Sequence, residues 1–577
     1  MAVLHDWRWT AFTPKLITAL SEGYTLARFR RDAVAGLTVA IVALPLAMAL
    51  GIASGASPDK GLITAVVAGF LISALGGSRA QVGGPTGAFV VVVFNVIAQH
   101  GYDGLLLATL LAGLLLIIAG YARLGALVKF IPHPVVTGFT AGIAVIIASS
   151  QVKDFLGLSI ATVPADFLPK WQAYLGAIGS IQAATLAMGV GSLLLIVGLR
   201  KVAPRLPGFL IAVVIASVAV ALLHLPVETI GSRFPHIPPG LPAPAMPEIS
   251  LVKVQAVLPS AFTIAFLAGI EALLSAVVAD GMIGSRHRSN QELVGQGVAN
   301  IASALFGGLP ATGAIARTAT NIKAGALTPV AGMLHALFLL LFILFATDLM
   351  AFVPMAALSA ILFMVAWGMS EHERFLNLLR MPNGDRAVLL LTFGLTVLVD
   401  LTMAIAVGVT LASLLFMMRM SEAVQIEAGP AGARAEDEGE DVHQRDALPE
   451  DVEVFRIDGP VFFGIAGELL DTLRRIGRAP RVIILRMRRV PLLDASGVTT
   501  IAEIVRQASA AGTQVILSGT QTQPLAMLDR VQLGRNSASA IHAGSFPEAL
   551  RIAASIANAT GTAPARSADI ERRKVRK

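Results

Sequence analysis

The sequence of 577 residues contains no cysteine and few charged residues. Without cysteine, the chain has no disulfide framework, no thiolate ligand for a metal and no cysteine nucleophile. Charged residues make up only 14% of the chain and hydrophobic residues 55%, with a mean hydropathy of +0.74. Soluble domains contain about 25% charged residues. The composition therefore argues against a soluble enzyme and predicts a protein that crosses the membrane several times.

Motifs for ATP-driven or catalytic chemistry are also missing. The sequence has no GxxxxGK[ST] motif, which argues against an ATP-driven pump. His133 and His224 have no partner at the spacing of metal ligands. We therefore expect no enzyme activity, no catalytic residues, no metal site and no cofactor.

The charges are unevenly distributed along the chain. Residues 1–420 contain 41 charged residues and a net charge of +7, whereas residues 421–577 contain 40 and no net charge. This shift predicts a membrane domain that ends near Arg419 and a soluble domain after it. Basic loops on one side of a membrane explain the positive charge better than a nucleic-acid partner does.

Fourteen apolar stretches precede Arg419. A helix needs about 20 apolar residues to cross the hydrocarbon layer, and the stretches at 85–99 and 312–323 are too short for this. The predicted segments are 33–55, 61–77, 85–99, 103–121, 127–151, 181–199, 206–223, 255–280, 291–306, 312–323, 327–347, 353–369, 386–400 and 402–418.

Basic residues in the loops predict the orientation. With the N-terminus inside, 18 Lys and Arg fall in loops predicted inside and 5 in loops predicted outside, as the positive-inside rule requires. The first 30 residues lack the apolar core of a cleavable signal peptide. We expect a multi-pass protein of the inner (plasma) membrane with both termini in the cytoplasm.

Two stretches of the membrane part are similar at an offset of 226 residues. The first reads ISALGG at 72–77 and GGPTGA at 83–88, and the second reads IASALFGG at 301–308 and PATGA at 310–314. Each Thr-Gly-Ala triplet opens one of the two short segments. The same offset leads from the first segment to the eighth. Two halves of seven segments are therefore predicted, and because seven is odd, the halves have opposite orientations.

The two short segments predict an anion site. The first N–H groups of a helix have no partner within the helix, and the helix dipole places partial positive charge there. Inverted repeats with one interrupted helix in each half are typical of secondary transporters. Two helix starts that face each other would bind an anion through backbone amides. The alternative is that glycine and proline only permit close packing or kinks.

Only two ionisable residues lie deep in the predicted segments, Glu271 and Arg317. Buried charges are costly in a membrane and usually mark a pathway or an ion pair. One interpretation is a structural ion pair between the two residues. The other makes Glu271 a proton-linked gate and Arg317 a source of positive potential at the anion site.

The part after Arg419 has the pattern of an α/β domain. An acidic linker is predicted at 421–450, the domain at 451–560 and a basic tail at 561–577. Strands are predicted at 452–463, 482–486 and 514–518, and helices at 466–478, 494–510, 521–532 and 546–559.

Several stretches resemble the SulP anion transporters, the family of sulfate permeases and bicarbonate transporters to which prestin and pendrin are related. They are ALPLAMALGIASG at 43–55, GGPTGAF at 83–89, FIPHPVVTGFTAGIA at 130–144 and TGAIARTATN at 312–321, and the tail with DASG at 494–497 resembles the STAS domain. The resemblance implies fourteen segments in seven-plus-seven inverted repeats with two half-helices, a core domain that moves against a gate domain, and a homodimer.

The resemblance also implies roles for single residues. It places the substrate between the third and tenth segments, and Arg317 matches an arginine of the prestin-like members. Glu271 and Ser275 match positions that hold sodium in the bicarbonate members, where the acid is Asp. The implied substrate-binding residues are Thr86, Gly87, Ala88, Gly313, Ala314, Ile315 and Arg317, and the implied coupling residues are Glu271 and Ser275.

Two departures from the family pattern favour H⁺ over Na⁺ as the coupling ion. Glu271 replaces the aspartate, and Ile315 stands where a hydroxyl group would help to bind sodium. The first span has no acidic residue at 44–46, where some dicarboxylate members have one. In related STAS domains the serine of the DxSG motif is phosphorylated, which makes Ser496 a candidate regulatory residue. The alternative is a helix N-cap formed by Asp494 or Ser496.

Together, these observations predict a proton-coupled secondary transporter of small inorganic anions, with sulfate as the favoured substrate. The alternative is a sodium- or proton-linked bicarbonate or C4-dicarboxylate transporter of the same fold. The predicted partners are the anion, the lipid bilayer, a second copy of the chain and a regulatory protein at the STAS domain. The predicted domains are a cytoplasmic segment at 1–32, a transport domain at 33–420 with repeats at 33–223 and 255–420, the linker, the STAS domain and the tail.

Overall fold

The structure is a computed structural model, and it divides the chain into two compact units, Met1–Ala412 and Ser413–Lys577, each of which is described by itself. The predicted basic tail, the linker from residue 429 onward and most of the predicted helix at 466–478 lie outside the described residues. The described residues are 12–126, 132–160, 163–164, 166–204, 206–235, 238, 240–399, 401–428, 451–465, 467, 469, 480–534 and 539–559.

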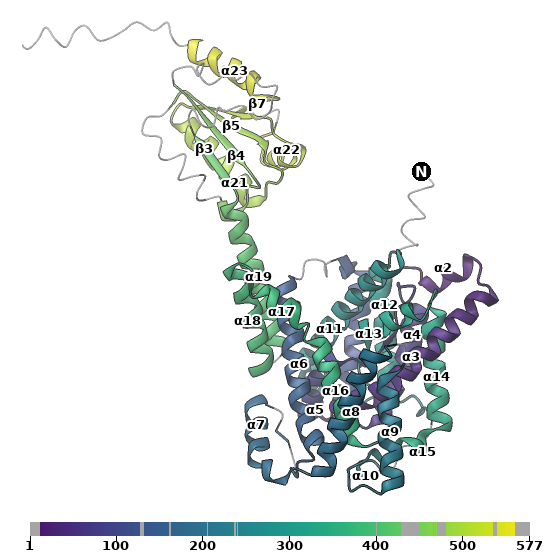
Figure 1. The fold of residues 1–577 in the computed structure, drawn as a ribbon. Coiled ribbons are helices and arrows are strands. Elements are labelled where there is room, and N and C mark those ends of the chain that lie inside the picture. Colours follow the sequence, from purple (N-terminus) through teal and green to yellow (C-terminus); the bar gives the residue numbers. More distant parts are fainter. Residues whose placement is uncertain are drawn as a thin grey trace, which may run out of the picture. The chain divides into compact units, whose positions relative to one another are not determined.

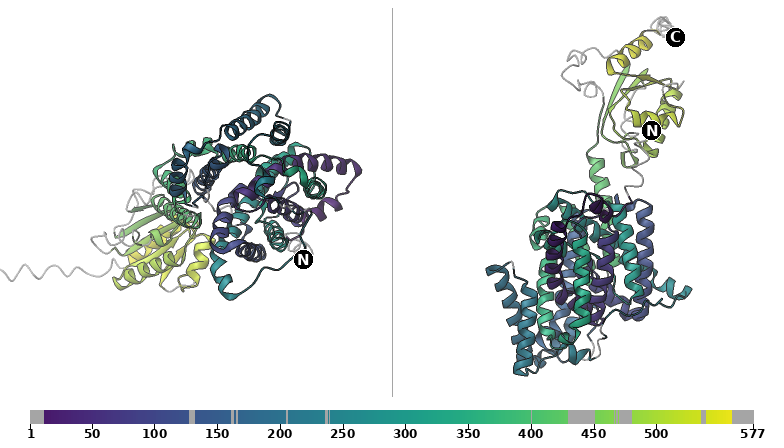
Figure 2. Two further views of the ribbon diagram at one scale, coloured as in Figure 1. Left: turned by 90° about the horizontal axis from the view of Figure 1, so that it is seen from below. Right: turned by 90° about the vertical axis from the view of Figure 1, so that its right-hand side faces the viewer.

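The first unit is a bundle of helices (Figure 1). Eight helices in the described part are long and apolar enough to cross a membrane, and two shorter apolar helices add to them. Figure 2 shows the long helices running alongside one another. Within the described residues, the fourteen predicted segments fall on helices, the last of which, α19, continues into the second unit, and this confirms the multi-span helical fold. The helices are α2 (Lys15–Ser21), α3 (Leu26–Ala53), α4 (Pro58–Leu75), α5 (Gly87–Tyr121), α6 (His133–Leu156), α7 (Phe167–Gly176), α8 (Ala183–Val202), α9 (Gly208–Leu223), α10 (Ile230–Arg233), α11 (Leu251–Ile283), α12 (Ser289–Leu305), α13 (Ile315–Lys323), α14 (Val330–Phe345), α15 (Thr347–Met350), α16 (Met355–Met369), α17 (His372–Leu378), α18 (Asn383–Leu398) and α19 (Leu401–Glu422).

The third and fourth predicted segments differ from expectation in one detail. They lie on one helix, α5, which is interrupted at Gly101, where φ is 72°. This left-handed conformation is open to glycine at little cost. The kink therefore divides α5 into the expected short segment and a full span. The other short segment, α13, has nine residues and remains separate.

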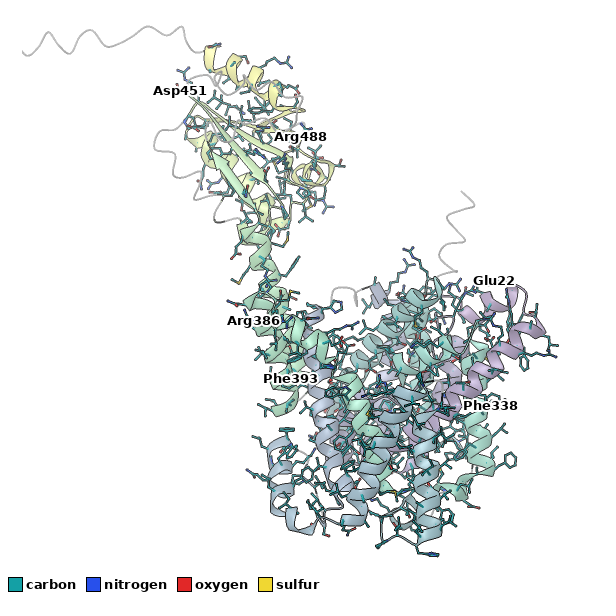
Figure 3. The ribbon with its side chains drawn as sticks, in the orientation of Figure 1. Glu22, Phe338, Arg386, Phe393, Asp451 and Arg488 are labelled. Carbon is teal, nitrogen blue, oxygen red and sulfur yellow. The ribbon has the colours of Figure 1, made fainter. Side chains whose placement is uncertain are left out.

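The helices pack into two groups. The core group comprises α3, α4, α5, α11, α12, α13 and α14, and the gate group comprises α6, α8, α9, α16 and α18. Within the core group, Gly113 on α5 and Gly297 on α12 approach so closely that a Cβ on either would lie within 2.6 Å of the other's carbonyl oxygen. Phe393 on α18 (Figure 3) packs edge-on against Phe375 of α17 beside the gate group.

A buried carboxylate holds the loop that leads into the first break. Glu292 on α12 is fully buried, and its Oε2 accepts hydrogen bonds from the backbone N–H groups of Gly77 and Ser78, at 2.7 and 3.1 Å. Gln296, one turn later, donates to the other oxygen. Because a buried carboxylate needs such donors, this contact ties the loop after α4 firmly to α12.

The second unit contains a five-stranded sheet in the order β3-β4-β5-β6-β7. Strand β3 is antiparallel to β4 and the other neighbouring pairs are parallel. Strand β3 lies within the segment predicted as linker, so that prediction was wrong for these residues. The strands are β3 (Gln425–Ala428), β4 (Val452–Asp458), β5 (Val482–Arg489), β6 (Gln514–Ser518) and β7 (Ala540–Ala543), and the described helices are α21 (Ala495–Ala510), α22 (Thr522–Asp529) and α23 (Phe546–Ala559).

Candidate functional site

The two predicted breaks lie side by side in the core group. Strand β1 (Gly83–Gly84) pairs antiparallel with β2 (Thr312–Gly313), with Gly83 opposite Gly313. The Ala314 N–H extends this pairing by donating to the Val82 carbonyl at 2.9 Å. Each short strand runs into a helix start, α5 after β1 and α13 after β2. We call residues 86–88 and 312–315, at these adjoining helix starts, the cradle.

The cradle presents backbone N–H groups that the helices leave without partners. Thr86 is the N-cap of α5 and Ala314 the N-cap of α13, and neither makes a side-chain capping bond. The first N–H groups of each helix have no carbonyl partner one turn earlier in the helix, although the Phe89 N–H donates to the Thr86 carbonyl at 3.3 Å. Both helix dipoles add positive potential there. Ile315 is 41% exposed, so the start of α13 is accessible.

The Arg317 side chain lies against Gly84 and Pro85, at the end of β1. It is 3% exposed, and its Nη2 donates to the Pro85 carbonyl at 2.5 Å. A Cβ on Gly84 would lie 2.3 Å from its Nη1, so glycine makes room for the guanidinium. Its Nε and Nη1 have no hydrogen-bond partner in the described part of the chain. The guanidinium thus joins α13 to the chain before α5 and adds a positive charge beside both helix starts.

Glu271 and Ser275 contact the same two segments from α11. The Thr86 hydroxyl donates to Glu271 Oε2 at 2.8 Å, and the Ser275 hydroxyl donates to Thr318 Oγ1 at 3.2 Å. Within the described residues, Glu271 and Arg317 form no ion pair with each other. The interpretation of these residues as a structural ion pair is therefore wrong, because each contacts a different partner.

Three further residues at the site had no predicted role. Thr318 accepts a hydrogen bond from the Val82 N–H at 3.1 Å, and the Thr312 hydroxyl donates to the Ala268 carbonyl at 2.8 Å. Both lie in the TGAIARTATN stretch, so the motif marked them without indicating their contacts. Gln81 is buried, and its side-chain amide has no partner in the described part. It precedes the GGPTGA stretch, and no feature of the sequence pointed to it.

The two glycines of the cradle face different surroundings. A Cβ on Gly87 would lie 2.6 Å from Met369 Sδ and 3.2 Å from Ile147 Cδ1, both from the gate group. A Cβ on Gly313 would lie 1.7 Å from Gln81 Nε2, within the core group. Gly87 therefore lies where the core group meets the gate group, whereas Gly313 faces the interior of the core group.

In the second unit, Ser496 lies in the first turn of α21. Asp494 is the N-cap of this helix, and its Oδ1 accepts a hydrogen bond from the Gly497 N–H at 2.7 Å. The N-cap predicted for Asp494 or Ser496 is thus Asp494, and the Ser496 hydroxyl is not needed for capping. Ser496 is partly exposed.

Comparisons with known proteins agree with this architecture. The model of the sulfate permease family matches residues 29–392, and the STAS domain model matches residues 447–543. The putative sulfate transporter YvdB of Bacillus subtilis (strain 168) is 42% identical over 518 residues, which are 89% of this chain and 95% of the relative. The bicarbonate transporter BicA of Picosynechococcus sp. is 31% identical, over 87% of this chain and 91% of the relative.

Solved structures show the same fold. The structure of SLC26A9 superposes with a TM-score of 0.83 over 97% of this chain and 95% of that chain, at 17% identity. The transmembrane domain of a cyanobacterial BicA superposes with a TM-score of 0.59 over 68% of this chain and 98% of that chain, at 30% identity. The chain therefore belongs to the sulfate permease family, which its motifs resemble, and contains a STAS domain after its membrane part.

Proposed function

We propose that this protein is a secondary active transporter of small inorganic anions, with sulfate as the favoured substrate. The observation that supports this most strongly is the cradle, where two helix starts adjoin and Arg317 adds a buried positive charge without a carboxylate partner in the described residues. Backbone N–H groups and one guanidinium provide donors and positive potential, which suits an anion. The relative YvdB is described as a putative sulfate transporter.

Transport in this proposal depends on movement of the core group against the gate group. Gly87 lies in the seam between them and has Ile147 and Met369 of the gate group as neighbours. If these contacts separate, the cradle would become accessible from the other side of the membrane. We further propose that both termini are cytoplasmic, that the protein is a homodimer in the plasma membrane, and that the STAS domain binds a regulatory protein.

The proposed coupling ion is H⁺ at Glu271. This carboxylate contacts Thr86 at the start of α5, so a proton on it would offset the charge of an anion in the cradle. The second candidate is a sodium-linked bicarbonate transporter. Thr86 donates to Glu271, and Ser275 donates to Thr318, so four side-chain oxygens lie in two pairs at the site. Hard oxygen ligands of this kind suit a small cation. BicA, which is named a bicarbonate transporter, is a relative.

Uptake into proteoliposomes tests the proposed substrate and coupling together. The purified full-length protein should accumulate radiolabelled sulfate when the external pH is lower than the internal pH, without a sodium gradient. Bicarbonate and C4-dicarboxylates are added as competitors. Uptake of bicarbonate that requires Na⁺, with no sulfate uptake, would support the second candidate instead.

Arg317 should act through its charge. We expect Arg317→Lys to retain part of the sulfate uptake, because an ammonium still places positive charge near Pro85. Arg317→Ala should lose at least about tenfold in sulfate affinity, which corresponds to about 1.4 kcal/mol. Sulfate affinity is measured by calorimetry on protein that elutes as a single species. Equal and normal affinity in both variants would show that Arg317 has only a structural role.

The second unit should be dispensable for anion binding. Helix α19 ends at Glu422, and every residue of the cradle lies in the first unit. A chain that ends at Glu422 is expected to bind sulfate with the affinity of the full-length protein, as measured by calorimetry. Loss of binding by a shortened protein with normal helical content would contradict this expectation.

A further inference from the structure

A cavity of about 170 Å³ lies in the seam between the core and gate groups. Residues of α3 and α5 line it from the core group, and residues of α6 and α16 line it from the gate group, together with α7 and α10. We call it the α7 cavity. A cavity needs only about 15 Å³ of such space to hold one water molecule. The α7 cavity therefore has room for a small anion and several waters.

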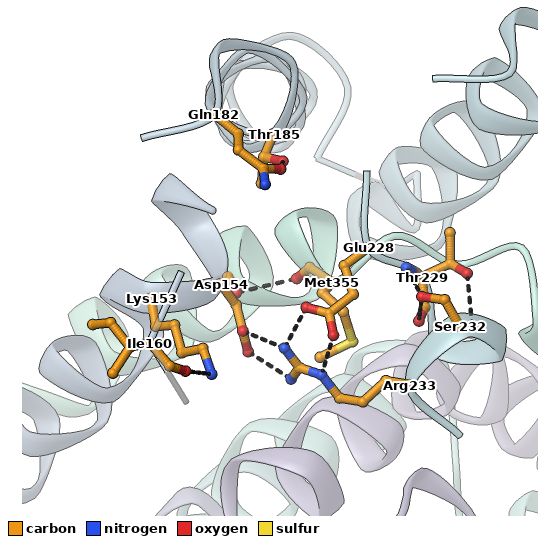
Figure 4. Close-up of polar contacts among 11 residues, drawn as sticks. Lys153, Asp154, Ile160, Gln182, Thr185, Glu228, Thr229, Ser232, Arg233 and Met355 are labelled. Atoms are coloured by element: carbon orange, nitrogen blue, oxygen red, sulfur yellow. Dashed lines mark hydrogen bonds and ion pairs between the residues drawn. The ribbon is translucent and has the colours of Figure 1, made fainter. Parts of the chain in front are cut away.

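Three of the four charged residues that line the α7 cavity are cations, and the carboxylates of Glu228 and Asp166 act on two of these cations from beside it. Lys153, Lys170, Arg233 and Asp154 are its charged lining residues. Arg233 donates to both oxygens of Asp154, at 2.6 and 3.1 Å, and also contacts both oxygens of Glu228 (Figure 4). Asp154 is thus occupied by Arg233 and is not available to a cation.

One of the two lysines already has a partner. The Lys153 ammonium donates to the Ile160 carbonyl at 2.8 Å (Figure 4). For the Lys170 ammonium, no hydrogen bond or ion pair is found in the described part of the chain. The Lys170 residue is nevertheless only 5% exposed. Lys170 is therefore the cation of the α7 cavity that is available to a ligand.

Tyr174 supplies a second available donor on the same face of α7. It follows Lys170 by four residues, which places both side chains on one side of the helix. Tyr174 is 3% exposed, and its buried hydroxyl has no partner among the described residues. Leu168 and Leu175 are exposed on α7, so its polar face turns inward. An unpartnered buried hydroxyl is costly, and a ligand in the cavity would remove that cost.

Burial also acts on the charge of Lys170, which lies in the loop between the fifth and sixth predicted spans. It lowers the pKa of the Lys170 ammonium, and Asp166 partly opposes this shift. A buried ammonium is therefore less favourable than an exposed one until an opposite charge comes close. An anion in the α7 cavity would provide that opposite charge, whereas a cation would repel the Lys170 ammonium.

We propose that the α7 cavity is a second anion site, in which the Lys170 ammonium and the Tyr174 hydroxyl bind a small oxyanion such as sulfate. Both groups donate to anionic oxygens, and Gln151 and Ser150 line the cavity with further polar atoms. The role of this site in transport rests on the function proposed above, but the binding itself does not.

The site occupies a position that suits entry to the cradle. Val90 and Val91 line the α7 cavity and lie one turn after Gly87 on α5. At Gly87, Ile147 and Met369 of the gate group close the seam beside the cradle. In the proposed topology α7 is on the outer side of the membrane. An anion from outside would therefore bind at Lys170 first and reach the cradle when the two groups separate.

Trp171 provides a local probe of this site. It is next to Lys170, and its ring centroid is 5.9 Å from that of Tyr174. In a full-length protein with Trp7, Trp9 and Trp367 replaced by phenylalanine, sodium sulfate at constant ionic strength should change the fluorescence of Trp171 saturably. Lys170→Gln should weaken the apparent sulfate affinity by about tenfold, equivalent to about 1.4 kcal/mol. Lys170→Arg should retain most of it.

Lys253→Gln is the matched control. Lys253 lies in the first turn of α11, in a segment also predicted outside, but it pairs with Asp103 and Glu248 and does not line the cavity. Its replacement removes the same charge and should leave the Trp171 response unchanged. An equal loss of affinity in this control, or no loss in Lys170→Gln, would overturn the proposal. The unmodified full-length protein and Lys170→Gln are compared by calorimetry, so the conclusion does not depend on the tryptophan replacements.

A third variant separates the two sites. With Arg317→Ala, which weakens the cradle, the Trp171 response to sulfate should persist. Loss of the response in this variant would mean that Trp171 reports binding at the cradle, and the α7 site would be rejected. A Lys170-dependent response in a protein that transports no sulfate would support the α7 site and reject the proposed function. If both proposals hold, Lys170→Gln should raise the KM for external sulfate by about tenfold with an unchanged kcat.

Discussion

Replacing Gly87 with valine is expected to abolish sulfate uptake by a protein that still folds. The new Cβ would lie 2.6 Å from Met369 Sδ and 3.2 Å from Ile147 Cδ1. Both atoms lie in the outer parts of flexible side chains, so the fold can accommodate the change by small shifts. The added methyl groups would nevertheless fill the seam beside the first N–H groups of α5. We expect a loss of at least about 100-fold in sulfate affinity, or about 2.7 kcal/mol.

The measurement is calorimetric sulfate binding and proteoliposome uptake, compared with Gly191→Val. Among the described residues, no atom lies within 4 Å of a Cβ added at Gly191 on α8, so this control adds the same side chain to a helix without filling the site. Gly87→Ala should give an intermediate loss. Normal uptake by a folded Gly87→Val protein would show that the start of α5 does not contact the anion.

The same substitution at Gly313 would be harder to interpret. Its Cβ would lie 1.7 Å from Gln81 Nε2, on the core side of the short strands. A loss of binding could then come from displacement of Gln81 and of the strand pairing around it. The two Thr-Gly-Ala triplets are equivalent in sequence, but only the one that begins α5 places its glycine against the gate group.

The adjoining breaks could be predicted from the sequence, whereas the contacts of the side chains around them could not. The triplets at Thr86 and Thr312 recur at one offset and open segments too short to span a membrane, so symmetry alone predicts that they meet. The spacing of residues in the sequence does not show in which direction a side chain points after a strand of only two residues. Arg317 therefore seemed a natural partner for Glu271, but it donates to the Pro85 carbonyl instead.

Strand β3 and the kink in α5 show the same limit at the level of secondary structure. The four residues of β3 follow an apolar helix and precede an acidic stretch, so they have no pattern of their own. They become a strand because β4 supplies their hydrogen-bond partners. Between the third and fourth predicted segments the sequence predicted a loop, but there a single residue with non-helical dihedral angles, Gly101, takes up the change of direction.

Replacing Glu271 with glutamine is expected to uncouple sulfate uptake from the pH gradient. In the wild-type protein, uptake should rise as the external pH falls, because a proton on Glu271 removes a negative charge close to the anion. Glutamine resembles the protonated carboxyl in shape and charge, and its amide oxygen can still accept from the Thr86 hydroxyl, which is 2.8 Å from Glu271 Oε2. Sulfate binding and exchange should therefore survive in Glu271→Gln, while accumulation driven by the pH gradient is lost.

The comparison with Glu271→Asp and Ser275→Ala distinguishes a proton site from a sodium site. Aspartate can still bind a proton, so Glu271→Asp should retain some dependence on pH. The Ser275 hydroxyl donates to Thr318 and does not contact Glu271 in the described network, so Ser275→Ala should leave proton coupling intact. A sodium ion would instead need the oxygens of both residues, and either Glu271→Gln or Ser275→Ala would then abolish Na⁺-driven uptake. Wild-type uptake that is independent of pH and requires Na⁺ would identify Glu271 as a cation ligand, because a carboxylate that binds sodium must remain deprotonated throughout transport.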